Sequence, residues 1–227
     1  MQTLTVIFLL IGAYLLGSIP SGLIIVKIGT GKDVRHVGSG RTGGTNVMRA
    51  AGTLAGLLTG LADFGKSALA VYLVRWMLPG MYWVEVAAGL LAMLGHNYSI
   101  YLPERKPDGR WHLRGGAGGV TCVGAAFGLW QPSLFFTFPI AALVFIFIGY
   151  ASVTTISAAV VSLVLFTYRA ATSAGPWEYA AFGALAVVVV LWALRPNLVR
   201  LRQGTERMVG LRVYLKKRAE QKKAGGR

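Results

Sequence analysis

Seven long apolar runs follow one another along this 227-residue chain, and they constrain its fold more than any other feature. A helix needs roughly 20 apolar residues to cross a bilayer. The runs lie at about 3–28, 51–78, 82–102, 116–130, 133–150, 152–168 and 177–194. Only 14% of the residues are charged, against about 25% in soluble domains. The sequence therefore predicts an all-α polytopic membrane protein whose single membrane-embedded domain occupies residues 1–227. Three of the runs, from 116 to 168, are short or closely spaced, so merging a pair would leave six or five spans.

The positions of Lys and Arg orient these spans. Of 23 such residues, 20 lie at 27–49, 105–114 and 195–227. Seven spans with the N-terminus outside would place all three segments in the cytoplasm, and the outer ends would carry only Arg75 and Arg169. The net charge of +15 then indicates a membrane surface rather than a nucleic acid partner. Residues 211–227 are expected to form a basic cytoplasmic tail beside anionic lipid headgroups.

Two stretches match nucleotide-binding patterns in the wrong context. Residues 38–43 satisfy G-x-G-x-x-G, and residues 60–67 satisfy G-x-x-x-x-G-K-S. Both patterns require a preceding strand, whereas the first follows a membrane helix and the second lies inside an apolar run. We therefore expect neither a dinucleotide-binding nor a nucleotide-hydrolysing domain.

Glycine, hydroxyl and arginine residues are concentrated in the polar segment 29–52. Glycine lets backbone N–H groups approach an anion closely, and successive N–H groups form concave phosphate sites. This segment predicts a phosphate site, for which the candidate residues are Gly38, Ser39, Gly40, Arg41, Thr45, Asn46 and Arg49. A flexible cytoplasmic loop is the alternative.

Two further polar groups fall at the same cytoplasmic level. Arg114, Gly115, Gly116 and Gly118 lie where the preceding loop enters the fourth run, and a helix N-terminus there favours an anion. Close packing through small residues is the other interpretation. Lys66 lies three residues after Asp63 in the second run, either as a self-neutralising pair or as the charged floor of a site.

His96 and Asn197 complete this level. His96, near the end of the third run, is a candidate general base or a structural histidine. Asn197 lies in a basic segment after the last run, where arginines that snorkel to the interface are the alternative. The three histidines lie on separate segments and Cys122 stands alone, so no metal site is predicted. The residues alone indicate a membrane enzyme or carrier for an organophosphate.

The order of these motifs resembles the PlsY-type bacterial acyl-phosphate:glycerol-3-phosphate acyltransferases. The resemblance rests on Gly17-Ser18-Ile19-Pro20, Asp33-Val34-Arg35, Gly38-Ser39-Gly40 with Gly43-Gly44-Thr45-Asn46-Val47-x-Arg49, Asp63-x-x-Lys66, Gly95-His96-Asn97-Tyr98, Gly115-Gly116-x-Gly118, and Asn197-Leu198-x-Arg200-Leu201-x-x-Gly204-Thr205-Glu206. These motifs run in the family's order over most of the chain. The family's seven helices, outside N-terminus and cytoplasmic site agree with the topology above.

The resemblance implies the reaction. A fatty acyl group would pass from acyl phosphate to the 1-hydroxyl of sn-glycerol 3-phosphate, giving lysophosphatidic acid and phosphate for phospholipid synthesis in the bacterial inner membrane. It implies no metal and no cofactor, and an upstream enzyme that forms acyl phosphate. By motif position, Ser39, Thr45, Asn46 and Arg49 would bind or orient phosphate, and Asn197 would close the site. Ser39 and His96 are the catalytic candidates.

Three positions depart from the family's pattern. Arg41 replaces an asparagine, Ala117 a lysine and Leu194 a histidine, and residues 104–112 resemble an insertion. We expect Arg41 to replace the charge that is absent at Ala117. One alternative is a diverged homologue with another acceptor or weak activity. The other is an organophosphate or anion carrier, which the one-sided polar residues and the absence of an evident repeat disfavour.

Overall fold

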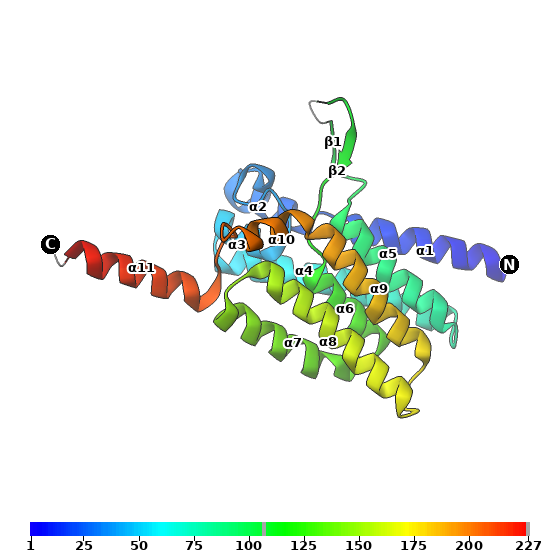
Figure 1. Cartoon of the computed structure of the whole chain (residues 1–227). Coiled ribbons are helices and arrows are strands. Elements are labelled where there is room, and N and C mark those ends of the chain that lie inside the picture. Colours follow the sequence, from blue (N-terminus) through cyan, green and yellow to red (C-terminus); the bar gives the residue numbers. More distant parts are fainter. Residues whose placement is uncertain (106–107, 226–227) are drawn as a thin grey trace.

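The computed structural model describes residues 1–105 and 108–225 as a bundle of helices with a small hairpin (Figure 1). The helices are α1 (Gln2–Ser18), α2 (Ser21–Thr30), η1 (Val34–His36), α3 (Gly44–Ala51), α4 (Thr53–Met77), α5 (Tyr82–Asn97), α6 (Gly119–Leu129), η2 (Gln131–Ser133), α7 (Leu134–Leu143), η3 (Val144–Ile148), α8 (Ala151–Ala171), α9 (Trp177–Ala193), α10 (Arg195–Arg202) and α11 (Gly210–Gly225). Lys106 and the last two residues of the expected basic tail lie outside the described residues.

Four helical stretches of the described chain are long and apolar enough to cross a bilayer: Gln2–Thr30, Thr53–Met77, Gln131–Ile148 and Ala151–Ala171. Helices α9 and α10 would make a fifth, although they meet at an angle of 66°. Helix α6 has only 11 residues because Gly118, with a φ of +88°, cannot continue a right-handed helix toward residue 116. Helix α5, of 16 residues, likewise ends well before residue 102.

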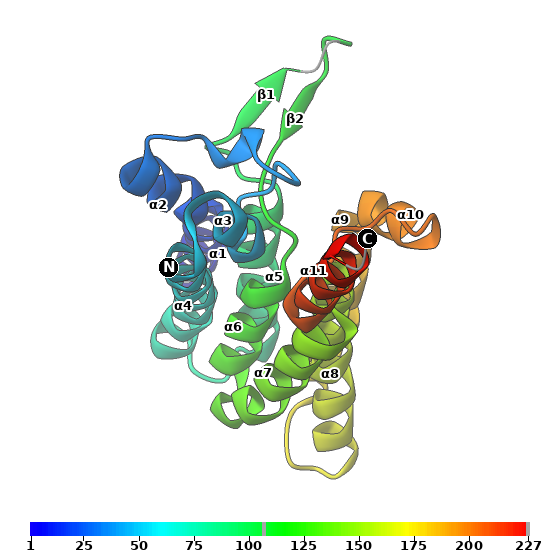
Figure 2. The same cartoon turned by 90° about the vertical axis from the view of Figure 1, so that its left-hand side faces the viewer.

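The first apolar run forms two helices rather than one. Pro20 lacks an N–H group, and its ring would clash with the preceding turn if α1 continued. Ile19 accordingly leaves the helical region, with a ψ of 118°, and α2 starts at Ser21. The break directs α2 across the end of the bundle (Figure 2).

A polar network joins four helices at the end of the bundle near the N-terminus. The Nη2 of Arg75, on α4, donates to Glu85 Oε2 at 2.9 Å, to the Leu129 carbonyl at 2.6 Å and to the Tyr179 hydroxyl oxygen at 2.8 Å. The Tyr179 hydroxyl also donates to Glu85 Oε2 at 2.6 Å. This Arg75 network therefore places the last turns of α4 and α6 beside the first turns of α5 and α9.

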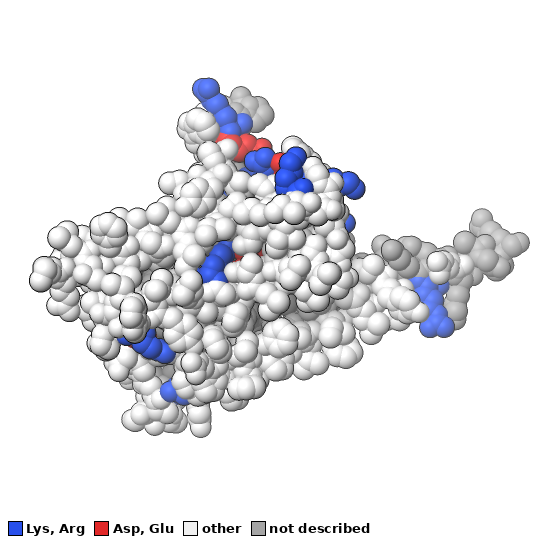
Figure 3. All heavy atoms as spheres, turned by 180° about the vertical axis from the view of Figure 1, so that it is seen from behind, with Lys and Arg blue, Asp and Glu red and all other residues white. Residues whose placement is uncertain are grey.

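The opposite end, which we call the polar end, carries α2, α3, α10 and the hairpin (Figures 1 and 2). Lys66 Nζ on α4 donates to the carbonyl of Ile19, just after α1, at 2.8 Å. Tyr150, just before α8, forms an antiparallel bridge with Met208. On the face opposite to that of Figure 1, charged side chains gather mainly around the hairpin, and most of the bundle surface is uncharged (Figure 3).

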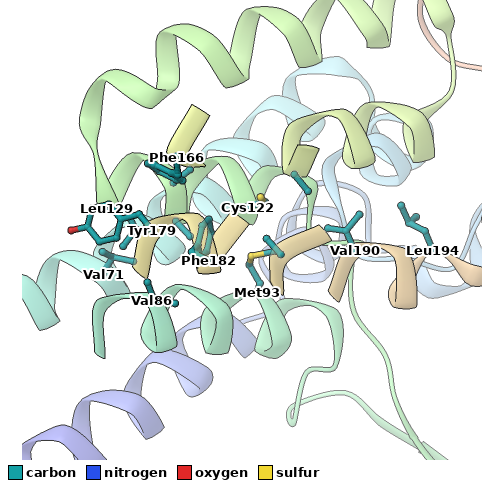
Figure 4. Close-up of a cluster of buried hydrophobic side chains, with 14 residues drawn as sticks. Val71, Val86, Met93, Cys122, Leu129, Phe166, Tyr179, Phe182, Val190 and Leu194 are labelled. Carbon is teal, nitrogen blue, oxygen red and sulfur yellow. The ribbon is translucent and has the colours of Figure 1, made fainter. Parts of the chain in front are cut away.

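The main hydrophobic core lies between α4, α5, α6, α8 and α9 (Figure 4). Phe166 and Phe182 are its largest fully buried side chains, and their rings pack edge to face at 6.2 Å. A second core of small residues joins α1 to α5, because Gly17 leaves no side chain between α1 and the backbone of Ala92. These cores fix the helices whose ends carry the site.

A third, smaller core positions the glycine loop. Val26 of α2, Val34 of η1 and Val47 of α3 pack together with no exposed surface. The loop between η1 and α3 is thereby held against the end of the bundle.

The segment expected to be an insertion forms a hairpin of two strands of three residues each, which the all-α expectation did not include. Strand β1 (Pro103–Arg105) pairs antiparallel with β2 (Trp111–Leu113), and Pro103 lies opposite Leu113. Arg114, at its base, forms an ion pair with Glu104. The rest of the described structure is helical or irregular.

Candidate active site

Asn46 shapes the glycine loop that precedes α3. Its Oδ1 accepts the Ser39 N–H at 3.0 Å, and its Nδ2 donates to the carbonyls of Val34, Val37 and Arg41 at 3.2, 2.9 and 2.9 Å. The side chain is only 2% exposed. Both ends of this amide are therefore occupied by the loop, so its place in the site is to hold the backbone in shape.

The loop wraps closely around this amide because of two glycines. Gly38 and Gly40 have φ values of +54° and +70°, which L-residues with a side chain rarely adopt. A Cβ on Gly38 would also strike Asn46 Oδ1. Ser39, between the two glycines, accepts the Arg41 N–H through Oγ at 3.4 Å, so its own O–H proton is left for another acceptor.

Arg41 joins the loop to two distant segments. Its Nη1 donates to the Gly116 carbonyl at 2.6 Å, and its Nη2 donates to the Ala193 carbonyl at 2.5 Å and to Asn197 Oδ1 at 3.3 Å. Burial lowers the Arg41 pKa, but an arginine stays protonated in proteins. One guanidinium therefore links the glycine loop, the turn before α6, the end of α9 and the start of α10.

Asn197 continues this chain of hydrogen bonds into the C-terminal segment. Its Nδ2 donates to Glu206 Oε1 at 2.8 Å, and Arg200 Nε donates to Glu206 Oε2 at 3.1 Å. Asn197 and Glu206 are each 8% exposed. Since the amide of Asn197 bridges Arg41 to Glu206, it fixes α10 against the loop.

The predicted pair of Asp63 and Lys66 is present and reaches a third group. Lys66 Nζ lies 2.8 Å from Asp63 Oδ1 and 3.2 Å from His96 Nδ1. His96 Nδ1 lies 3.5 Å from Asp63 Oδ1. All three side chains are almost fully buried, so the pair is more than a self-neutralising couple and places a charged group beneath His96.

The glycine turn, residues 115–118, lies directly on the end of α5. A Cβ on Gly115 would strike the backbone of His96 and Asn97, and one on Gly116 would strike the His96 ring. The Gly116 N–H donates to the His96 carbonyl at 2.8 Å. The Asn97 side-chain amide lies against Gly118 and has no hydrogen-bond partner among the described residues.

Two predicted binding residues keep unused polar groups. The Arg49 guanidinium and the Thr45 hydroxyl make no hydrogen bond within the described chain, and both are on α3 beside the loop. A Cβ on Gly38 would lie 3.6 Å from Arg49 Cδ. Partial burial and the positive charge of Arg207 lower the Arg49 pKa. An anion at this position would relieve that repulsion.

Arg114 differs from the other predicted residues because it serves the hairpin. It pairs with Glu104 and donates through Nη1 to the Arg35 carbonyl at 3.3 Å. Its guanidinium thus joins the hairpin base to the start of the glycine loop. A Cβ on Gly40 would lie 3.6 Å from Arg114 Nη1, so the group borders the loop without entering it.

The departures from the family pattern have different surroundings. Arg41 brings its charge to the carbonyl of Gly116, the residue next to Ala117. Leu194 is 2% exposed and belongs to the main core, so it supplies no polar group. The neighbouring Arg195 stacks over Trp192, with its guanidinium carbon 3.3 Å from the ring centroid.

The structure thus gathers the loop, Lys66, His96, the glycine turn and Asn197 at the polar end. Asn97 and Glu206 were not among the predicted site residues, although both lie within the motifs Gly95–Tyr98 and Asn197–Glu206. Within residues 1–105 and 108–225, no three His, Cys, Asp or Glu side chains are grouped so that they could hold a metal ion.

Comparisons with known proteins agree with this arrangement. The family model "Glycerol-3-phosphate acyltransferase" matches residues 7–204. The glycerol-3-phosphate acyltransferase of Thermus thermophilus is 36% identical over 213 residues, which cover 91% of this chain and 96% of that protein. Glycerol-3-phosphate acyltransferase 2 of Moorella thermoacetica is 38% identical over 205 residues, covering 89% and 97%.

A solved structure gives the same result. The crystal structure of PlsY, an integral membrane glycerol 3-phosphate acyltransferase in its glycerol 3-phosphate form, superposes with a TM-score of 0.79 at 29% identity, covering 93% of this chain and 98% of that one. Its lysophosphatidic acid form superposes with a TM-score of 0.76. The glycine loop, the glycine turn and all but the end of the C-terminal motif lie inside the matched region, and the chain belongs to the glycerol-3-phosphate acyltransferase family as a helical integral membrane protein.

Proposed function

We propose that the polar end transfers a fatty acyl group from acyl phosphate to the 1-hydroxyl of sn-glycerol 3-phosphate, giving lysophosphatidic acid and inorganic phosphate. One observation carries the proposal: Arg41 joins three segments that are distant in sequence around one cationic, glycine-rich surface. The glycerol 3-phosphate and lysophosphatidic acid forms of the related PlsY structure name the same acceptor and product.

The reaction needs little covalent chemistry from the protein. The acceptor hydroxyl oxygen bonds to the acyl carbon, the bond from that carbon to the phosphate oxygen breaks, and the hydroxyl proton passes to the departing phosphate. Catalysis then depends on positioning two anions and on stabilising the charge that develops on the carbonyl oxygen. No metal, nucleotide or other cofactor is required for these steps.

The groups left unused by the fold are suited to this task. Arg49 and Thr45 have free donors, and the Ser39 O–H proton is available beside them. We assign these three to substrate, Arg49 and Thr45 as phosphate ligands and Ser39 as the catalytic candidate. Asn46 and Asn197 act as positioning residues without contacting substrate, because their amides are occupied by the loop and by Glu206.

The two ends of the bundle support an arrangement of seven spans with the N-terminus outside. The Arg75 network groups the ends of α4 and α6 with the starts of α5 and α9, and Gln2 Nε2 lies 3.5 Å from Met81 Sδ at that same end. Most Lys and Arg residues lie at the other end. By the positive-inside rule the polar end, and with it the site, would face the cytoplasm of a bacterial cell. An enzyme that forms acyl phosphate would supply the donor from that side.

The test is phosphate release by purified protein given palmitoyl phosphate, with and without sn-glycerol 3-phosphate. We expect release that depends on the acceptor, and a loss of about tenfold or more in Arg49→Gln, which removes a charge-assisted hydrogen bond. Arg105→Gln is the matched control, because Arg105 lies exposed on the hairpin. Acceptor-independent or absent release from folded protein, beside an active relative, would contradict the proposal.

A further inference from the structure

The three partners of the Lys66 ammonium restrict where His96 can carry its proton. Lys66 Nζ lies 2.8 Å from Asp63 Oδ1, 2.8 Å from the Ile19 carbonyl and 3.2 Å from His96 Nδ1. An ammonium group has three N–H donors and no acceptor. It can interact favourably with all three atoms only if Nδ1 is an acceptor, and Nδ1 must then be unprotonated.

The other protonation states of His96 are disfavoured by the same geometry. A proton on Nδ1 would point toward the ammonium, and Asp63 Oδ1 at 3.5 Å is beyond an ordinary N–H···O distance. An imidazolium would place two cations 3.2 Å apart where both residues are only 6% exposed. The remaining state is the neutral ring with its proton on Nε2.

The Nε2 edge of the ring faces the glycine turn. A Cβ on Gly116 would overlap Nε2, Cε1 and Cδ2, so the backbone of Gly116 packs directly against this edge and only a glycine fits there. The hydrogen bond from the Gly116 N–H to the His96 carbonyl fixes the turn against the same residue. Nε2 itself makes no hydrogen bond within the described residues.

We propose that Asp63 and Lys66 are positioning residues that hold His96 as a neutral Nε2–H donor directed at the glycine turn. His96 then donates a hydrogen bond to a substrate oxygen, of the phosphate or of the acyl carbonyl, and does not act as a general base. The part that concerns substrate rests on the function proposed above. The part that concerns the proton does not.

The proton assignment is tested without substrate. In the full chain labelled with ¹⁵N-histidine, His96 is distinguished from His36 and His112 by comparison with a His96→Gln sample. At neutral pH we expect a protonated Nε2 and an unprotonated, hydrogen-bonded Nδ1 on His96. Lys66→Met should remove the shift of Nδ1 that this hydrogen bond causes. A protonated Nδ1 in the unaltered protein would overturn the proposal whether or not the variant folds.

The role in the reaction is tested with two amides of different reach. Glutamine can place an N–H group near the position of Nε2, whereas asparagine reaches only as far as Nδ1. We expect His96→Gln to retain about tenfold more kcat than His96→Asn, the factor that one hydrogen bond supplies. Equal loss in both variants would overturn the donor role.

The pH profile separates a donor from a base. The charged groups in contact with the imidazole are Asp63 and Lys66, both from α4. On the side of the glycine turn, the Arg41 guanidinium is bonded to the carbonyl of Gly116. The His96→Gln variant should keep the pH dependence of kcat/KM of the unaltered enzyme. Loss of an acidic limb in that variant would show that His96 is a base. Failure of the proposed function would instead abolish acceptor-dependent phosphate release and leave the ¹⁵N result unchanged.

Discussion

Replacing Arg41 with asparagine gives the residue expected from the family's motif, yet we expect the change to impair this protein. The guanidinium donates to the Gly116 and Ala193 carbonyls and to Asn197 Oδ1. An asparagine side chain is too short to reach any of these acceptors from the loop. The loop, the glycine turn and α10 would lose the group that joins them.

The size of the effect follows from these three bonds. A hydrogen bond from a charged donor contributes about 1.5–3 kcal/mol, and removing the donor leaves its acceptors unsatisfied. The bonds share one group and are not additive, and the Arg41 side chain keeps part of its surface in contact with solvent. We therefore expect a loss of about 2 kcal/mol, which is roughly thirtyfold in kcat/KM.

The assay is acceptor-dependent phosphate release, with thermal unfolding in detergent as a separate measure of stability. The variants Ala117→Lys and Arg41→Asn/Ala117→Lys complete a double-mutant cycle, because the family pattern is expected to carry a lysine at this position. If Arg41 replaces that lysine, the double variant should regain at least fivefold over Arg41→Asn. An Arg41→Asn enzyme as active as the unaltered protein would refute this reasoning.

Three other variants address other parts of the molecule. Glu85→Gln should lower the free energy of unfolding by about 2 kcal/mol, because it breaks a largely buried ion pair. It should leave the KM for glycerol 3-phosphate unchanged. A tenfold rise in KM would contradict this. Gly116→Ala should reduce kcat by tenfold or more by displacing the His96 ring, whereas Gly12→Ala, where a Cβ meets nothing within 4 Å, should be neutral. Hydrogen bonding to Arg35 lowers the pKa of Asp33 to about 2 from 3.8. The carboxylate therefore stabilises the fold above pH 4, by no more than about 1 kcal/mol after solvent screening. That contribution should disappear between pH 4 and pH 2. If the free energies of unfolding of Asp33→Asn and the unaltered protein differed by the same amount at pH 2 and at pH 6, the contribution would be excluded.

Hydropathy predicted the long helices well because lipid-facing segments must be apolar along their length. The run at 51–78 became α4, from Thr53 to Met77, and the run at 177–194 became α9. The break at Pro20 was not predicted, since apolar residues continue on both sides of it. The hairpin and helices α3 and α10 were missed for a different reason. The strands have three residues each and helices α3 and α10 have eight, which is too short for an apolar repeat to stand out in the sequence.

The site residues were predicted together with roles, but the contacts that define those roles were not predicted. Motif position indicated Asn46 and Asn197, yet only the structure shows their amides bonded to the loop carbonyls and to Glu206. The pair of Asp63 and Lys66 followed from helical spacing and is confirmed. The pair also contacts His96, which lies on α5, and the sequence around Asp63 and Lys66 does not indicate this contact. Long-range partners of this kind arise from packing, which a single sequence does not reveal.

The bonds made by Arg41 also have a consequence for the order in which the protein is made. The glycine loop, with its donor, leaves the ribosome early, but two of its acceptors belong to Ala193 and Asn197, near the far end of the chain. A nascent chain that has inserted α1 to α8 therefore has the loop but lacks two of the three acceptors of the Arg41 guanidinium. The connection from the glycine loop to α10 forms only when α9 and α10 arrive, so an incompletely synthesised protein in the membrane lacks the complete polar end.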